Sequence, residues 1–159
     1  MPTAIVLGAG ISGLLAARSL RAAGWTVTVL DQGRGVGGRL ATRRIAGQAF
    51  DHGGQFLSVR EPRFAALVAE WERAGAVAQW GRGFLGDDGH VAADGFPRYR
   101  APGGMTQLAK HLADGLTVEL DTTITAIASD GDAATARAAD RTWRADTLIA
   151  TAPVAQTLA

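Results

Sequence analysis

The chain has 159 residues, a net charge of +1 and 19% charged residues, so it is long enough for one domain with a hydrophobic core, and no basic excess suggests a nucleic-acid partner. It contains no cysteine, which excludes disulfide bonds, thiolate metal sites and cysteine catalysis. No apolar run approaches the roughly 18 residues that cross a bilayer, and no signal peptide is visible, so we expect a cytoplasmic protein without a membrane partner.

The first 24 residues predict a strand, a glycine-rich turn and a helix. The apolar run Ile5–Leu7 leads into a G-x-G-x-x-G turn, and a small-residue helical pattern follows until Gly24. In such a turn Gly8 permits the tight reversal, Gly10 lets the backbone approach a pyrophosphate, and Gly13 lets the helix pack close to the strand. The helix N-terminus then offers free N–H groups to phosphates.

Residues 25–30 alternate apolar and polar and predict a second strand, which Asp31 closes. In dinucleotide-binding proteins an acid at this position binds a ribose hydroxyl, of FAD or of NAD. An ordinary strand–turn–helix with incidental glycines is the alternative, but it would not explain the acid. The segment therefore predicts an α/β fold of the Rossmann type with a central parallel sheet.

A basic, glycine-dense segment follows from Gln32 to Arg44, and we predict a loop. Gly37 and Gly38 expose backbone N–H groups beside the guanidinium of Arg39, a combination that suits a phosphate or a flavin ribityl chain. A surface loop with scattered arginines is the alternative. Gln32 is also counted among the cofactor-binding residues.

The segment from residue 50 to 56 predicts a place where a flat ligand meets the backbone. Gly53 and Gly54 permit close backbone approach, Gln55 can hydrogen-bond a ring edge, and Phe56 can pack beside the ring. His52 is a candidate general base, although a single histidine without a visible partner is more often structural. We predict no catalytic side chain and no metal site.

The remaining elements are predicted from periodicity and turn residues. Helices are expected from Pro62 to a stop at Gly75, and from the residues after Ala101–Met105 to about Ala113. The first of these helices places Phe64, Leu67, Val68 and Trp71 on one packing face. We expect short strands and loops over 77–100 with a turn at 87–89, and strands at 116–120 and 122–127. Residues 134–138 and 142–144 complete a predicted antiparallel meander. A buried strand at 147–151 is expected to return to the main sheet, and a helix to begin at 154–158.

The order of these motifs resembles the two-dinucleotide-binding flavoprotein superfamily, which includes amine oxidases, and within it the renalase family. The segments that carry the resemblance are 8–13, 37–42, 51–56, 101–105 and 148–153. It implies that FAD is the cofactor, that Ser12 and the three glycines of the turn hold its pyrophosphate, and that Asp31 takes the adenosine ribose. It also implies that Arg39 contacts the phosphates or ribityl chain, that Gln55 and Phe56 lie near the isoalloxazine, and that Ile124 presents backbone groups to the adenine.

The resemblance implies an FAD-dependent oxidoreductase that transfers a hydride from a reduced small molecule, such as a dihydronicotinamide nucleotide or an amine, to flavin N5, with reoxidation by O₂. Family members continue into a substrate-binding domain, so residues 1–159 are expected to form an incomplete FAD-binding domain that self-associates or takes a complementary half. An NAD-dependent dehydrogenase is an alternative, but the only tyrosine, Tyr99, and the only lysine, Lys110, form no Tyr-x-x-x-Lys pair. The second alternative is a non-catalytic module that binds a dinucleotide.

Overall fold

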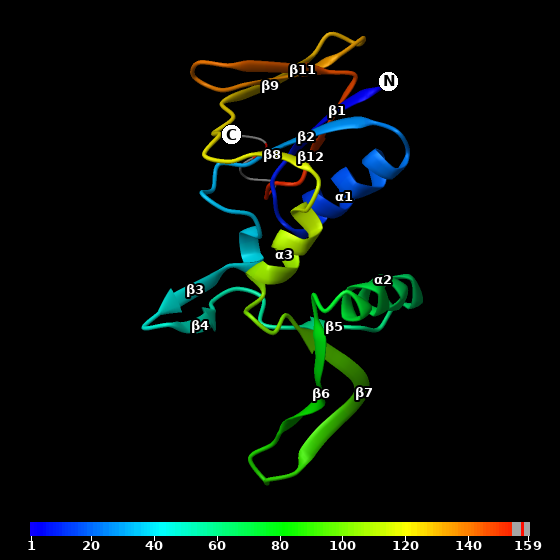
Figure 1. Ribbon diagram of the computed structural model, residues 1–159, viewed down its shortest axis with the longest axis vertical. Coiled ribbons are helices and arrows are strands. Elements are labelled where there is room, and N and C mark those ends of the chain that lie inside the picture. Colours follow the sequence, from blue (N-terminus) through cyan, green and yellow to red (C-terminus); the bar gives the residue numbers. More distant parts are fainter. Residues whose placement is uncertain (154–156, 158–159) are drawn as a thin grey trace. The chain divides into compact units, whose positions relative to one another are not determined.

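The computed structural model describes residues 1–153 and 157, and the chain divides into two compact units (Figure 1). The first unit comprises Met1–Gly38 and Leu112–Ala159, and the second comprises Arg39–His111. Within the described residues, no helix has the length and apolar character needed to cross a membrane. Each unit is described by itself below.

The first unit is built on a four-stranded, all-parallel sheet with the strand order β12-β1-β2-β8. This arrangement confirms the predicted central parallel sheet and the return of the late strand to it. Its strands are β1 (Thr3–Leu7), β2 (Thr26–Leu30), β8 (Thr117–Glu119) and β12 (Thr147–Ala150).

Helix α1 (Ile11–Ala22) connects β1 to β2 and packs against both strands. It buries Gly13, Leu14 and Ala17, the small and apolar positions that recur at helical spacing. Gly24 follows with a φ of +85°, so it adopts the left-handed conformation typical of a glycine after a helix C-terminus.

Three antiparallel strands in the order β11-β10-β9 form the predicted meander. They are β9 (Ala126–Ser129), β10 (Ala134–Arg137) and β11 (Thr142–Ala145). The prediction of a strand over 122–127 was wrong at its start, because the Thr122 N–H donates to the carbonyl of Asp31 (2.9 Å) and its hydroxyl donates to the Leu120 carbonyl (2.9 Å). The helix expected at 154–158 lies outside the described residues, except for position 157.

The second unit begins with a hairpin where the sequence predicted a loop up to Arg44. Strands β3 (Thr42–Ile45) and β4 (Gln48–Asp51) pair antiparallel across Ala46 and Gly47, whose φ values are +49° and +79°. Two positive φ values are the signature of a type I′ hairpin turn. Ala-Gly is a weaker signal for that turn than Asn-Gly, which is why the sequence did not reveal the hairpin.

A three-stranded sheet in the order β5-β7-β6 also belongs to the second unit (Figure 1). Its strands are β5 (Leu57–Ser58), β6 (Ala78–Leu85) and β7 (Val91–Arg100), so β6 and β7 are longer than the short strands predicted over 77–100. The predicted turn at 87–89 does join them. The interruptions that the glycines suggested occur as register shifts between Gln79 and Gly81 and between Gly81 and Gly83, within otherwise continuous strands. A Cβ at Gly83 would lie 2.5 Å from the Ala92 carbonyl oxygen, so this glycine also permits close pairing.

Both helices predicted after residue 60 are present as α2 (Pro62–Arg73) and α3 (Thr106–Ala113), and the second unit ends within α3 at His111. The Glu61 carboxylate caps α2 by accepting from the Phe64 N–H (2.9 Å). Of the predicted packing face, Val68 and Trp71 are buried, whereas Leu67 is 37% exposed. Leu108, Ala109 and Leu112 of α3 are buried, as their spacing predicted.

Side chains from the β3–β4 hairpin cap the first turn of α3. Asp51 Oδ1 accepts hydrogen bonds from the Met105 N–H (2.8 Å) and from the Thr42 hydroxyl (2.5 Å). The same Thr42 hydroxyl accepts from the Thr106 N–H (3.0 Å). A Cβ at Gly104 would lie 2.4 Å from the Thr42 methyl carbon, so this position requires glycine.

Candidate functional site

The turn between β1 and α1 is closely packed on one side. Gly8, with a φ of +105°, donates its N–H to the Leu30 carbonyl (2.8 Å), which closes the turn against β2. A Cβ at Gly13 would lie 1.9 Å from the Gly8 carbonyl oxygen. The chain can therefore enter α1 this close to β1 only because residue 13 has no side chain.

On its other side the turn is open. Gly10 is the N-cap of α1, and no side chain caps the helix among the described residues. No atom lies within 4 Å of a Cβ placed on Gly10, so this position faces free space. The N–H groups of the first helical turn, with the exposed Ser12 among them, have no acceptor within the helix. Together with the partial positive charge of the helix terminus, they can bind an anion.

Asp31 lies beside this turn, at the end of β2. Its Oδ2 accepts from the Ala9 N–H (2.5 Å) and its Oδ1 accepts from the Gly33 N–H (2.6 Å). The carboxylate is half-buried, and each oxygen retains a lone pair that can accept a hydroxyl. The structure therefore joins the predicted acid to the glycine turn, and Gln32 follows as an exposed side chain.

The second glycine motif packs against the first. Gly37 donates its N–H to the Ala9 carbonyl (2.8 Å) and forms an isolated parallel bridge with Gly10. Gly38 has a φ of +52°, and a Cβ on it would lie 3.4 Å from the Gly10 Cα. Two segments that the sequence singled out separately are therefore adjacent in the first unit.

Thr151 completes the turn from the end of β12, a role that sequence reasoning did not assign to it. Its hydroxyl donates to the Leu7 carbonyl (2.8 Å). The same oxygen lies 2.7 Å and 2.8 Å from the positions that Cβ atoms would take on Gly8 and Gly13. The residue stands at the end of a predicted strand, but only the pairing of β12 with β1 brings it to the turn.

Ile124 lies in the short segment before β9, outside any strand. Its side chain packs against the core cluster of Ile5, Leu30, Ala136 and Ala145. The side chain is therefore occupied in the core, and the backbone of this segment is what remains for a ligand.

Glu119, at the end of β8, ties the meander to the neighbourhood of Asp31. Its carbonyl accepts from the Asp31 N–H (3.0 Å). Its carboxylate pairs with Arg141 (2.8 Å) and accepts from the Trp143 indole N–H (3.2 Å). The Arg141 guanidinium also lies 4.6 Å from the Trp143 ring centroid. Sequence reasoning missed this group because its members are distant in the chain.

In the second unit the structure brings Arg39 together with Gly53 and Gly54. Gly54 donates its N–H to the Arg39 carbonyl (2.7 Å), and a Cβ on Gly53 would lie 2.0 Å from that same oxygen. The glycine pair therefore lets two backbone segments meet, a reason for glycine that involves no ligand. The Arg39 side chain is exposed.

Gln55 and His52 are exposed, and the His52 N–H donates to the Ala41 carbonyl (3.3 Å). Phe56 instead belongs to an aromatic cluster that the sequence did not reveal. Its ring centroid lies 5.8 Å from that of Trp80 and 5.5 Å from that of Phe84.

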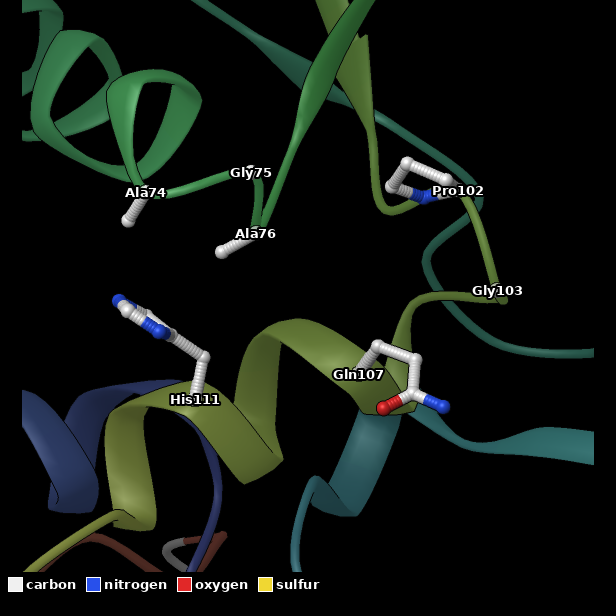
Figure 2. A pocket seen from close by; sticks show the side chains of 7 residues that line it. All are labelled: Ala74, Gly75, Ala76, Pro102, Gly103, Gln107 and His111. Carbon is white, nitrogen blue, oxygen red and sulfur yellow. The ribbon is translucent and has the colours of Figure 1, made fainter.

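A cavity of about 330 Å³ lies in the second unit between the C-terminal end of α2 and α3 (Figure 2). Figure 2 shows the His111 imidazole directed toward Ala74 and Ala76. The cavity is lined by Ala74, Gly75, Ala76, Pro102, Gly103, Gln107 and His111. None of the residues predicted to bind a cofactor lines it.

Comparison with known protein families gives two adjacent matches. A domain described as an NAD(P)-binding Rossmann-like domain matches residues 6–71. The family described as flavin containing amine oxidoreductase matches residues 78–157, half of the chain.

Individual proteins are similar over parts of the chain. Putrescine oxidase from Kocuria rosea is 35% identical over 129 residues, which cover 75% of this chain and 26% of the relative. An L-amino acid dehydrogenase from Synechocystis sp. is 36% identical over 95 residues, which cover 58% of this chain and 20% of the relative. The chain thus spans about a quarter or less of the length of these relatives.

Solved structures share the fold. Wild-type putrescine oxidase bound to putrescine superimposes with a TM-score of 0.76 at 17% identity, covering 98% of this chain and 59% of the other. A CLA-producing fatty acid isomerase from P. acnes gives a TM-score of 0.76 at 14% identity, covering 99% of this chain and 60% of the other. At these identities the likeness concerns the fold, and it agrees with the predicted α/β class.

Proposed function

Because the chain belongs to the flavin-containing amine oxidoreductase family, we propose that it supplies the FAD-binding part of an enzyme that oxidises a small molecule. The observation that carries the proposal is the open turn at Gly10. There, uncapped N–H groups and the positive end of α1 face free space beside a half-buried carboxylate. This donor set fits a dinucleotide, whose pyrophosphate needs hydrogen-bond donors and whose ribose needs an acceptor.

The proposed contacts follow the parts of the cofactor. The N-terminus of α1, with Ser12, binds the pyrophosphate, and Asp31 with Gln32 accepts the adenosine ribose hydroxyls. Arg39 pairs with the phosphates or the ribityl chain, and Ile124 offers backbone groups to the adenine. Glycines complete the backbone of the site, and Gln55 and Phe56 lie beside the isoalloxazine. The glycines are Gly8, Gly10, Gly13, Gly37, Gly38, Gly53 and Gly54.

FAD held by the N-terminus of α1, Asp31 and Arg39 would supply the redox chemistry, as a hydride acceptor that O₂ can reoxidise. The residues of this chain bind and orient the cofactor, and we assign none of them a catalytic proton transfer. Such a division is usual where a cofactor performs the reaction and the protein provides position and electrostatics.

An amine is the substrate class that we favour, because curated relatives include a putrescine oxidase and an L-amino acid dehydrogenase. A dihydronicotinamide nucleotide is the second candidate, supported by the resemblance of the motif order to renalases. Both classes lose a hydride to a flavin, so the assay must offer each in turn.

We further propose that residues 1–159 act as an FAD-binding domain and that polypeptide outside these residues supplies part of the substrate-binding surface. The short span relative to curated relatives supports this view. Exposed Leu85 and Val91 on the β6–β7 hairpin support self-association or a complementary half.

The test is a visible absorption spectrum of the purified chain after incubation with FAD and desalting. We expect a retained flavin spectrum for the wild type and its loss in Gly10→Val. Gly10 has φ −76° and ψ 175° and free space around its Cβ position, so valine fits the fold and obstructs only a ligand. Gly35→Val is the matched control, because Gly35 also faces free space but has no proposed contact. Retained flavin in Gly10→Val would refute the proposed turn.

A further inference from the structure

A buried arginine on β7 has no role in the proposed cofactor chemistry. Arg98 is 5% exposed, and among the residues whose burial the structure describes it is the one charged side chain in the buried class. Burying a guanidinium is costly unless its charge and its N–H groups are satisfied, so its surroundings need an explanation.

A bulge in β7 supplies the partner of Arg98. Gly83 pairs with Ala93 and Gly81 pairs with Arg98, so four residues of β7 lie opposite a single residue of β6. Within this bulge Gly95 has a φ of +78°. The bulge brings a carboxylate that stands four residues before Arg98 within hydrogen-bonding distance of its guanidinium.

That carboxylate belongs to Asp94 and holds the guanidinium at two points. Arg98 Nη2 donates to Asp94 Oδ2 (2.8 Å) and Nη1 donates to Oδ1 (3.1 Å). Oδ1 also accepts from the Phe96 N–H (3.1 Å), which fixes the carboxylate within the bulge. These hydrogen bonds hold the pKa of the Asp94 carboxyl below its ordinary value, Arg98 contributing most. A two-point contact fixes the plane of the guanidinium as well as its position.

The fixed guanidinium lies against the aromatic cluster. Its carbon is 4.4 Å from the Phe84 ring centroid and 5.8 Å from that of Phe56. Arg98 Nε has no hydrogen-bond partner among the described residues. Trp80 and Phe84 are 52% and 46% exposed, so solvent rather than protein covers much of the cluster. The guanidinium is therefore a rigid support for rings that have few other neighbours to hold them.

We propose that Arg98 is a positioning residue. Its planar guanidinium, held in place by two hydrogen bonds to Asp94, sets the orientation of the Phe56 ring. The proposal rests on the proposed function, in which Phe56 lies beside the isoalloxazine. Lysine cannot replace Arg98 in this role, because an ammonium is a point charge without a plane or a two-point contact.

Arg60 provides the matched control. Its guanidinium approaches the same Asp94 carboxylate (3.6 Å) and lies 4.9 Å from the Phe96 ring centroid. It is 64% exposed, however, and the structure gives it no contact with the Phe56 ring. Removing its charge tests whether any arginine beside Asp94 would serve.

The first measurement needs no flavin. Trp80→Phe identifies the part of the near-ultraviolet circular dichroism that arises from the cluster. We expect Arg98→Met and Arg98→Lys to lose that part while far-ultraviolet circular dichroism is retained, and Arg60→Gln to keep it. If Arg98→Met does not fold, Asp94→Asn is the alternative variant, because it weakens the hold on the guanidinium while Arg98 stays in place. The same loss of the near-ultraviolet signal is then expected.

A double-mutant cycle in urea tests whether Arg98 acts through Phe56. Each single variant, Arg98→Met and Phe56→Leu, is expected to lower the folding equilibrium constant by some factor. We expect the product of these two factors to exceed the factor measured for the double variant by at least about threefold, because the two side chains interact. The proposal would be overturned if the loss in the double variant equalled the product of the two single losses in the folding equilibrium constant. An unchanged near-ultraviolet spectrum in a folded Arg98→Met variant would also overturn it.

The second measurement is the visible circular dichroism of flavin bound to the chain. We expect Arg98→Met and Phe56→Leu to change it in the same way. For Arg98→Met we expect the Kd for FAD to stay within about threefold of wild type, because Arg98 has no proposed contact with the cofactor. A wild-type chain that stays colourless would refute the proposed function, while the flavin-free measurements would still decide whether Arg98 holds Phe56. Bound flavin with an unchanged spectrum in Arg98→Met would refute the positioning role alone.

Discussion

Gly13→Ala measures how closely α1 packs against the end of β1. The added Cβ would lie 1.9 Å from the Gly8 carbonyl oxygen and 2.8 Å from the Thr151 hydroxyl oxygen. Such contacts do not occur below 3.0 Å, and the first one is to backbone, so helix and strand must separate by more than about 1 Å. Overpacking of this kind costs about 1–3 kcal/mol and sometimes more.

Alanine also favours the helix over glycine by about 1 kcal/mol, which offsets part of that cost. Because the closest contact is with backbone, we take the upper part of the overpacking range, about 2–3 kcal/mol, and expect a net loss of about 1–2 kcal/mol in the free energy of unfolding, measured by urea denaturation followed by circular dichroism. Gly10→Ala is the matched control, since its Cβ meets no atom within 4 Å and should leave stability within about 0.5 kcal/mol of wild type. A Gly13→Ala variant as stable as the wild type would refute the close packing of helix and strand.

Three further predictions concern other parts of the chain. Thr42→Val should lower the free energy of unfolding by about 1–3 kcal/mol in urea, because its hydroxyl joins the β3–β4 hairpin to the first turn of α3; unchanged stability would contradict that link. Arg39→Ala should weaken FAD binding by about 1.5–3 kcal/mol in a flavin fluorescence titration, whereas Arg43→Ala should not, and equal effects would remove Arg39 from the proposed site. The pKa of Asp146 is lowered by hydrogen bonds from the Thr3 N–H (2.7 Å) and hydroxyl (2.8 Å), so its stabilisation is present above about pH 3.9 and is lost as the pH falls through its lower folded-state pKa. Asp146→Asn should therefore differ most from wild type at neutral pH, and a stability difference that persists unchanged at pH 2 would contradict this assignment.

Much of the first unit was predictable because its signals are local. The spacing of Gly8, Gly10 and Gly13 identified the turn and the start of α1, since the backbone geometry that requires each glycine is set by residues close to it in the sequence. Alternating apolar residues identified β2, and Asp31 at its end followed from the same pattern. Periodicity and turn residues fix such elements without reference to the rest of the chain.

The hairpins of the second unit were less predictable because local and tertiary preferences differ there. Ala46 carries a positive φ that alanine rarely adopts alone, and the pairing of β3 with β4 imposes it. Gly83 borders the bulge between β6 and β7 and also permits the close approach of these strands. In both places neighbouring strands, rather than the residue's own preference, decide the conformation.

The candidate site shows the same division between sequence and tertiary structure. Sequence alone determined the α/β class, the glycine turn with its acid, and the residues proposed to bind FAD. Tertiary structure decided that Thr151 braces the turn, that Gly53 and Gly54 receive the Arg39 carbonyl, and that Arg98 lies beneath an aromatic cluster. The physical reason is that backbone preferences act over a few residues, whereas packing and hydrogen bonding between strands join groups that the chain order keeps far apart.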